Sequence, residues 1–253
     1  MIHNSETLLR AKERGVPLAM VTAYTAFSAR LAEKAGVDLI LVGDSVANVV
    51  WGYDTTRAIG MEEMLLSVGA VARSTRSTHI VVDLPWKSNL TPELALANSQ
   101  RFFDAGAHSV KLEMTPHAWS VAEAFSREKI PFVPHLGLLP QTAVSRKQHI
   151  RRPEEREELL RSGRRLEEMG ALMLVVEHVP DEAGEALARS VKIPVIGIGA
   201  GPHVDGQVLV FHDLLGLGET TPPIARQFVA GGDLLLQGMK EYIEWVLRRG
   251  RLK

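Results

Sequence analysis

The sequence predicts a (β/α)8 barrel, a closed cylinder of eight parallel strands surrounded by helices. Eight short apolar segments rich in Val, Ile and Leu recur along the chain, as expected for strands buried on both faces. Segments with helical spacing alternate with them, which leaves a doubly wound sheet or a barrel as candidate folds. Eight such units in 253 residues match the usual size of a barrel, so the barrel is the prediction.

The predicted strands share a run of consecutive apolar residues that ends near a polar or turn-forming residue. In chain order they are residues 17–24, 37–44, 79–86, 108–114, 130–138, 171–179, 193–201 and 207–215. No linker rich in Ser or Gly interrupts this alternation. We therefore expect residues 1–253 to form a single barrel domain with a short N-terminal helix and a C-terminal helical extension.

Helix boundaries are clearest in three of the intervening segments. The segment 25–36 begins on a capping Thr and ends on Gly, and 91–106 adds a Pro at its first helical position. The segment 152–170 places acidic residues early and ends on Gly, which suits the helix dipole. A further capped amphipathic helix is predicted to begin near Asn4 or Ser5.

The composition narrows the classes of function. Lys and Arg total 29 against 30 Asp and Glu, and a balance this close to neutral argues against a nucleic-acid-binding protein. No apolar stretch reaches the ~18 residues that a membrane-spanning helix needs. The charged residues 1–15 do not resemble a secretory signal, so we expect a cytoplasmic protein without a membrane partner. The chain has no Cys, which excludes disulfides and thiolate zinc sites.

Titratable residues fall where five of the predicted strands end. They are Asp44, Asp83, Glu113, His135 and Glu177. The strands of a parallel barrel open their carboxyl ends onto one face, so we expect these side chains to converge on one cavity. A solvated loop position or a helix cap would explain any single one, and the capping alternative stays open for Asp83. Five coincidences together favour a shared site.

Three of these residues, Asp44, Asp83 and Glu113, form a predicted metal site. Crowded carboxylates repel one another, and burial favours their protonated forms. A hard divalent cation removes this conflict, and carboxylate oxygens suit Mg²⁺, directly or through water. Lys111 lies two residues before Glu113, on the same face of its strand. It would balance the acids or receive an anionic substrate group, although a packed stem with its ammonium in solvent is an equal alternative.

Two further motifs carry less weight. The glycines of 197–201 lack the spacing of a dinucleotide-binding fingerprint, and close backbone approach explains them better. Asp205, His212 and Asp213 follow in the next segment, and we expect capping and turn roles for them.

Longer motifs match one enzyme family. They include "VTAYTAFSARLAEKAGVDLILVGDS", "VVDLPW", "VKLE", "PHLGLLPQ", "VVEHVP" and above all "IPVIGIGAGPHVDGQVLVFHDLLGL". In these motifs the chain resembles the ketopantoate hydroxymethyltransferases, from about residue 5 to residue 217. The resemblance implies a (β/α)8 TIM barrel of the phosphoenolpyruvate mutase and isocitrate lyase group, assembled as a large homo-oligomer.

The resemblance also implies a reaction. A hydroxymethyl group would pass from 5,10-methylenetetrahydrofolate to the 2-oxo acid 3-methyl-2-oxobutanoate, through a metal-stabilised enolate and with Mg²⁺ as cofactor. The product would be 2-dehydropantoate, a precursor of pantothenate. Matched position by position, the implied metal ligands are Asp44, Asp83 and Glu113, the substrate contacts are Ser45, Lys111, Asp44, Asp83 and His135, and the catalytic base is Glu177.

The chain departs from the family pattern beside these residues. Met114 and Thr115 replace a Gly-Gly pair, Pro134 replaces a Gly, and the basic segment 145–152 replaces a glycine-containing loop. Other differences lie at 46–48, 137–141 and 176–180. Because the acids are kept while their surroundings change, a paralogue that hydroxymethylates a different 2-oxo acid is an alternative.

Two other readings remain. One is a C–C lyase or mutase of the related barrel group, although such enzymes often use a cysteine-bearing loop and this chain has no Cys. The other is a barrel that binds a 2-oxo acid without turning it over, and the intact titratable residues on five strands argue against it.

Overall fold

Eight parallel strands close into a barrel in the order β1 to β8 in the computed structural model, which describes residues 3–143, 150, 152–220 and 222–248. The strands are β1 Leu18–Thr22, β2 Leu39–Val42, β3 His79–Asp83, β4 Ser109–Glu113, β5 Phe132–Gly137, β6 Leu174–Glu177, β7 Val195–Ile198 and β8 Gly206–Leu209. Strand β8 pairs with β1, which closes the cylinder. The predicted barrel is therefore confirmed, and the doubly wound sheet is excluded because an open sheet leaves its edge strands unpaired.

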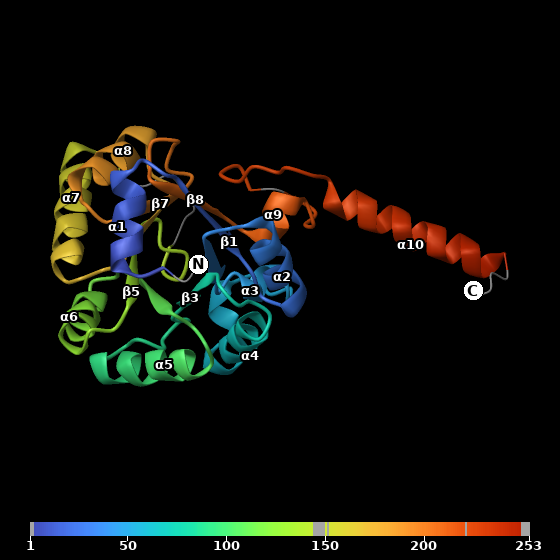
Figure 1. Cartoon of the computed structure of the whole chain (residues 1–253), viewed down its shortest axis with the longest axis horizontal. Coiled ribbons are helices and arrows are strands. Elements are labelled where there is room, and N and C mark those ends of the chain that lie inside the picture. The colour runs from blue at the N-terminus through green and yellow to red at the C-terminus, as the bar shows by residue number, and fades with distance from the viewer. Residues whose placement is uncertain (1–2, 144–149, 151, 221, 249–253) are drawn as a thin grey trace.

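The helices follow the strands and surround them (Figure 1). They are α1 Ser5–Glu13, α2 Ala26–Ala35, α3 Val46–Val49, the 3-10 helix η1 Thr56–Ala58, α4 Met61–Ala72, α5 Pro92–Asp104, α6 Ala118–Glu128, α7 Pro153–Glu168, α8 Asp181–Ser190, α9 Phe211–Leu215 and α10 Gly231–Leu247. The predicted caps are confirmed. Thr25 and Thr91 accept hydrogen bonds from backbone N–H groups three residues on, and Gly36 ends α2 in the left-handed region.

One predicted strand was wrong over half of its length. Residues 207–215 were expected to form a single strand, but β8 stops at Leu209 and α9 begins at Phe211. The backbone N–H of Phe211 donates to the hydroxyl oxygen of Thr22 at 2.8 Å, which removes it from the strand ladder. A short apolar run does not by itself distinguish a buried strand from a buried helix.

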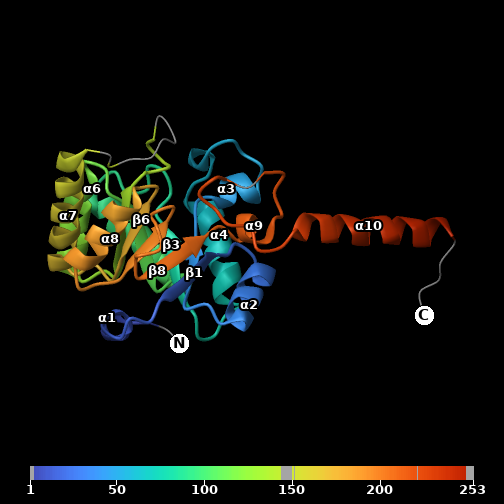
Figure 2. The same cartoon turned by 90° about the horizontal axis from the view of Figure 1, so that it is seen from above.

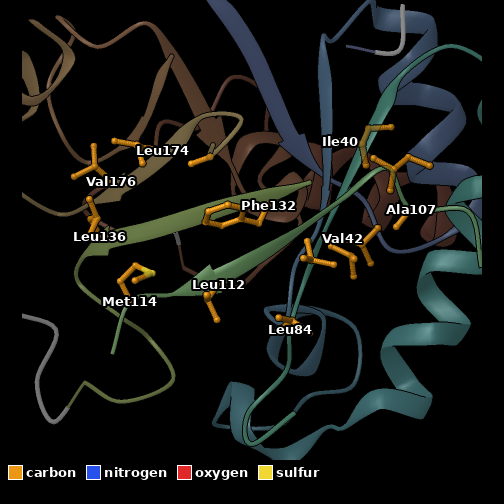
Figure 3. Close-up of a cluster of buried hydrophobic side chains, with 14 of the residues drawn as sticks. Ile40, Val42, Leu84, Ala107, Leu112, Met114, Phe132, Leu136, Leu174 and Val176 are labelled. Atoms are coloured by element: carbon orange, nitrogen blue, oxygen red, sulfur yellow. The ribbon is translucent and has the colours of Figure 1, made fainter. Parts of the chain in front are cut away.

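Alternation along the strands divides the apolar core into two layers. Side chains that point outward pack against the helices and form the larger cluster, part of which Figure 3 shows with Ile40, Phe132 and Val176. Side chains of the opposite parity, including Val133 and Val175, fill the inside of the barrel. A residue's place in the sequence therefore decides whether it faces the helices or the barrel axis.

Helix α1 closes the N-terminal end of the barrel. Its Leu8 is fully buried and packs with the inner cluster, and the ammonium of Lys12 pairs with Asp205 at 2.8 Å. Asp205 also accepts the N–H of Val195 at the start of β7, so it caps no helix there and links α1 to β7 beside its own turn. Figure 2 shows α1 on the opposite side of the barrel from α3, which leaves the C-terminal end of the strands for a site.

The outer layer has a gap beside β8. Of the residues in the eight strands, all of which are described, only Ala19 and Gln207 are exposed, and they are register partners in β1 and β8. Helix α10, which should follow β8 back along the barrel, instead projects away from it with no buried residue (Figures 1 and 2). None of the helices in the described ranges is long and apolar enough to cross a membrane.

Candidate active site

A cavity of about 810 Å³ opens at the C-terminal ends of the strands. All seven predicted site residues line it, and they are Asp44, Ser45, Asp83, Lys111, Glu113, His135 and Glu177. Four of the strand-end residues occupy alternate positions that point to the inside of the barrel, so strand alternation alone directs their side chains toward the axis. They are Asp83, Glu113, His135 and Glu177. The fold thus brings together side chains that lie far apart in the sequence.

The register of β3 and β4 sets Asp83 directly opposite Lys111. The ammonium lies 2.7 Å from Oδ1 of Asp83, and both side chains are buried. The other oxygen of Asp83 accepts the backbone N–H of Asp44 at 3.0 Å. Asp83 therefore holds two neighbouring strand ends together and does not cap a helix, which settles the alternative that the sequence left open.

Burial and crowding act in opposite directions on these charges. Desolvation disfavours the ammonium of Lys111, but Asp83, Glu113 and Asp44 outweigh it and raise the pKa of Lys111 above its ordinary value. Burial, reinforced by Asp83, raises the pKa of Asp44 to about 7. Burial, reinforced by Asp44, raises the pKa of Glu113 to about 8. Both acids therefore favour their protonated forms more than ordinary carboxyl groups do, and a bound cation would stabilise their charged forms.

His135 lies between Lys111 and Glu177. The Nζ of Lys111 is 3.3 Å from Nδ1 of His135, and Nε2 of His135 is 3.3 Å from Oε2 of Glu177. Burial and the charge of Lys111 lower the pKa of His135, so its ring is neutral. An ammonium has only donors, which makes Nδ1 the acceptor and assigns the ring proton to Nε2, facing Glu177. Within the described residues this second contact is not yet a well-aligned hydrogen bond.

Ser45 is held by a residue that the sequence did not single out. The hydroxyl of Tyr24 lies 2.8 Å from Oγ of Ser45, and Tyr24 is buried at the end of β1. Burial raises the pKa of Tyr24, which keeps its hydroxyl neutral and available for this contact. Ser45 is also the N-cap position of α3 but makes no capping hydrogen bond with its side chain, so the contact with Tyr24 is what holds it at the edge of the cavity.

Gln141 is the second residue that sequence reasoning missed. It is buried in the loop after β5, its backbone N–H lies 3.2 Å from each carboxylate oxygen of Glu113, and its side-chain amide donates to Asp44 at 2.8 Å. The motif "PHLGLLPQ" contains it, but a loop residue has no periodicity to mark its direction. Asp213, for which a turn role was expected, also lines the cavity.

The departures from the family pattern fall into two groups. Met114, Pro134 and Leu139 do not line the cavity, whereas Asn48 and His178 do. The basic segment 145–152 lies largely outside the described residues, which include only 150 and 152 of it. The differences at Asn48 and His178, which line the cavity, are therefore the ones that can alter which acid fits.

The donor set suits a hard divalent cation. Three buried carboxylates face one ammonium, and Oδ1 of Asp44 makes no hydrogen bond within the described part of the chain. Among the same described residues, no group of three His, Asp or Glu side chains is arranged to hold a metal ion by itself. This combination fits Mg²⁺, which usually takes one or two carboxylates directly and completes its shell with water and substrate oxygens.

Known structures share the fold at low sequence identity. Phosphonopyruvate hydrolase, solved in complex with oxalate and Mg²⁺, superposes with a TM-score of 0.65 at 16% identity over 96% of this chain and 98% of that one. A 2,3-dimethylmalate lyase, described as a member of the PEP mutase/isocitrate lyase superfamily, gives a TM-score of 0.60 at 14% identity over 98% and 88%. These similarities show that the chain shares the barrel fold of these proteins.

Sequence relatives are much closer. A protein of Geobacillus kaustophilus named 3-methyl-2-oxobutanoate hydroxymethyltransferase is 42% identical over 238 residues, which are 92% of this chain and 85% of that protein. The model of the family described as ketopantoate hydroxymethyltransferase matches residues 3–250. With the strand-end acids gathered in one cavity and this match along nearly the whole sequence, the chain belongs to the ketopantoate hydroxymethyltransferase family.

Proposed function

We propose that this protein transfers a hydroxymethyl group from 5,10-methylenetetrahydrofolate to 3-methyl-2-oxobutanoate, giving 2-dehydropantoate for pantothenate biosynthesis. The observation that carries this proposal is the convergence of Lys111, His135, Glu177 and the acids on one cavity in a chain of this family. The cavity is larger than a five-carbon acid requires and leaves room for a second reactant. A cytoplasmic location remains a prediction from the sequence.

The acids Asp44, Asp83 and Glu113 are proposed to hold Mg²⁺, directly or through water. When bound, the cation supplies Lewis-acid stabilisation of the negative charge that develops on the keto oxygen. Asp44 offers the oxygen that lacks a hydrogen bond within the described residues. Both oxygens of Asp83 already contact protein groups, so Asp83 contributes through its remaining lone pairs or through water.

Lys111 and Ser45 are proposed to hold the substrate carboxylate. Lys111 stays charged because Asp83 lies beside it, and its remaining donors are available to an anion in the cavity. Ser45 is fixed by Tyr24 on another strand end, so the two groups approach the carboxylate from different directions. Two fixed contacts determine which face of C3 the substrate presents.

Glu177 is proposed to remove the proton from C3. Breaking that C–H bond leaves a carbon nucleophile, which forms the new C–C bond to the one-carbon unit of the folate. The C–N bonds from this carbon to the folate break, water supplies the hydroxyl group, and tetrahydrofolate leaves. His135 is placed to position the base, because its Nε2 lies 3.3 Å from Oε2 of Glu177 and donates to that oxygen once the two groups align. The base and Lys111 lie on opposite sides of the His135 ring, and both line the cavity that would hold the substrate.

The decisive experiment incubates the protein with a panel of 2-oxo acids, 5,10-methylenetetrahydrofolate and Mg²⁺, and reads product mass. We expect 3-methyl-2-oxobutanoate to gain one hydroxymethyl unit. Preferential turnover of another acid would replace this substrate with that of a paralogue. Cleavage of an acid without folate would favour the lyase of the related group, and binding without turnover would overturn the enzymatic proposal.

We also propose that the protein is a homo-oligomer in which α10 packs on a second copy. Leu235, Met239, Tyr242 and Val246 recur at helical spacing along α10, and between 47% and 64% of each is exposed. The gap beside β8 exposes Ala19 and Gln207 where other strands are covered by helices, which is the place that a helix from a second copy would fill. An apolar stripe of this length is unfavourable in water.

Light scattering on the full chain tests this assembly. We expect a mass of at least two chains, and a Met239→Glu, Tyr242→Glu variant should shift it toward one. Gln237→Glu adds a charge on the opposite face of α10 and serves as the control that keeps the wild-type mass. A monomeric wild-type protein would overturn the proposal.

A further inference from the structure

Gln141 contacts polar groups of three other segments of the chain through its backbone N–H and its side-chain amide. Its backbone N–H faces both carboxylate oxygens of Glu113 at 3.2 Å. Its side-chain Nε2 donates to Oδ2 of Asp44 at 2.8 Å and to the carbonyl oxygen of Leu84 at 3.0 Å. A single loop residue after β5 thereby contacts groups at the ends of β2, β3 and β4.

These contacts fix the orientation of the amide. Nε2 has two hydrogens, and both partners, a carboxylate oxygen and a carbonyl oxygen, can only accept. Exchanging the nitrogen and oxygen of the amide would place an acceptor against two acceptors, so the amide has one allowed orientation. Gln141 is also 5% exposed, which leaves its side chain no room to rotate away.

The backbone of Gln141 is anchored independently of its side chain. Nε of Arg57, on η1, donates to the carbonyl oxygen of Gln141 at 2.5 Å. The guanidinium of Arg57 also lies over the ring of Trp86, 4.9 Å from its centroid. Segments that follow β2 and β3 therefore hold the loop after β5 in place over the acids.

We propose that Gln141 is a positioning residue that orients Asp44 and Glu113 as ligands of the divalent cation. With Oδ2 of Asp44 engaged by the amide, Oδ1 has a fixed direction within the cavity that it lines. The backbone N–H of Gln141 lies 3.2 Å from both oxygens of Glu113 and restrains that carboxylate as well. This inference rests on the proposed metal site, and groups that orient ligands usually change metal affinity by about 10- to 100-fold.

The test measures Mn²⁺ affinity by electron paramagnetic resonance in a Gln141→Met variant. Met fills the same space and keeps the backbone N–H, so only the two amide donations are lost. Gln100→Met is the matched control, because Nε2 of Gln100 also donates to an aspartate, Asp104, at 2.8 Å, but on the exposed surface of α5. Thermal unfolding of the metal-free proteins shows whether each variant folds.

We expect Gln141→Met to weaken Mn²⁺ binding about 10- to 100-fold and Gln100→Met to leave it unchanged. Turnover of Gln141→Met should return toward the wild-type rate as the metal concentration is raised, which a purely structural defect would not allow. Unchanged Mn²⁺ affinity in a folded Gln141→Met variant would overturn the inference. A Gln141→Met variant that fails to unfold cooperatively is replaced by Gln141→Asn, which keeps a polar amide but cannot reach Asp44, and the same loss is expected. A wild-type protein that binds no Mn²⁺ would instead overturn the metal site on which the inference depends.

Discussion

His135 presents its Nε2 to Oε2 of Glu177 at 3.3 Å, across the pairing of β5 with β6. The ring is buried, and its Nδ1 accepts from Lys111, so it cannot turn away from this contact. The imidazole therefore stays beside Oε2 of Glu177, where its Nε2–H restrains that oxygen once the two groups align. His135 is thus placed to orient the carboxylate of Glu177 without itself contacting the proton that Glu177 is proposed to remove.

Replacing Glu177 with Gln should abolish removal of the C3 proton. Gln has the same shape but no basic oxygen, so exchange of the C3 hydrogen for deuterium, measured by NMR without folate, should slow by about 10²- to 10⁴-fold. Mn²⁺ affinity, measured alongside, should stay within about twofold. Undiminished exchange would remove Glu177 as the base.

A His135→Phe variant should slow the same exchange less severely. It removes the donor that restrains Glu177, and one hydrogen bond of about 1–1.5 kcal/mol corresponds to roughly a tenfold effect. His135→Gln keeps an N–H donor and should recover part of the rate. Equal rates in wild type and His135→Phe would show that Glu177 needs no orienting partner.

Asp44 and Ser45 are neighbours with separate proposed roles, which kinetics can distinguish. Asp44→Asn should lower Mn²⁺ affinity at least about 100-fold, since it removes a proposed ligand. Ser45→Ala should keep the metal affinity and raise the KM for the 2-oxo acid about tenfold, since it removes one hydrogen bond to a carboxylate. An Asp44→Asn variant with an unaltered metal requirement would exclude Asp44 as a ligand.

His79 makes stability depend on pH at the closed end of the barrel. Burial and the adjacent His108 lower the pKa of His79 to about 4. Its two ring nitrogens contact the carbonyl oxygen of His3 and the hydroxyl of Ser109. The unfolded chain binds the proton of this histidine more readily than the folded chain does. The contribution of His79 to the free energy of unfolding is therefore fully present above about pH 6.5 and is lost as the pH falls toward 4. The expected loss is about 3 kcal/mol.

Urea unfolding of wild type and His79→Gln between pH 8 and pH 4 checks this expectation. The variant should show a shallower loss of stability on acidification, even where it is less stable at pH 8. His3 and His108 also have lowered pKa values and titrate in both proteins, so the difference between the two curves isolates His79. Parallel curves would exclude it as an acid-sensitive group.

Two glycines with the same backbone conformation should respond differently to Ala. Gly137 and Gly170 have φ of +87° and +86°, but a Cβ on Gly137 would lie 2.3 Å from the carbonyl oxygen of Glu177, whereas Gly170 has nothing within 4 Å. Gly170→Ala should cost about 1–2 kcal/mol for its left-handed backbone. Gly137→Ala should cost about 3 kcal/mol or more and displace Glu177. Denaturant unfolding gives both values, and equal losses would contradict the crowding at Gly137.

Much of the fold and of the candidate site could be predicted from the sequence, because both depend on local patterns. Eight apolar runs predicted eight strands, and alternation along each run predicted that Lys111 and Glu113 share a face. The carboxyl ends of parallel strands meet at one end of a barrel, so the convergence of Asp83, His135 and Glu177 on one cavity followed. The motif resemblance supplied the family and the expected roles.

The second half of the predicted strand 207–215 could not be decided in this way. Its apolar residues fit a buried strand and a buried helix equally well. The outcome depended on Thr22, distant in sequence, which accepts the N–H of Phe211 where the strand ends. Similarly, helical spacing predicts that α10 is a helix, but only the closed barrel shows that no part of its apolar stripe is buried by the described residues of the same chain.

The sequence by itself determined which residues are inward-facing acids, since side-chain direction in a strand depends only on position along that strand. Tertiary structure decided which of them are partners. The register of β3 and β4 pairs Lys111 with Asp83, and closure of the barrel brings Gln141 to Asp44, 97 residues away. Such contacts depend on how distant segments are held in space, and no local periodicity records that distance.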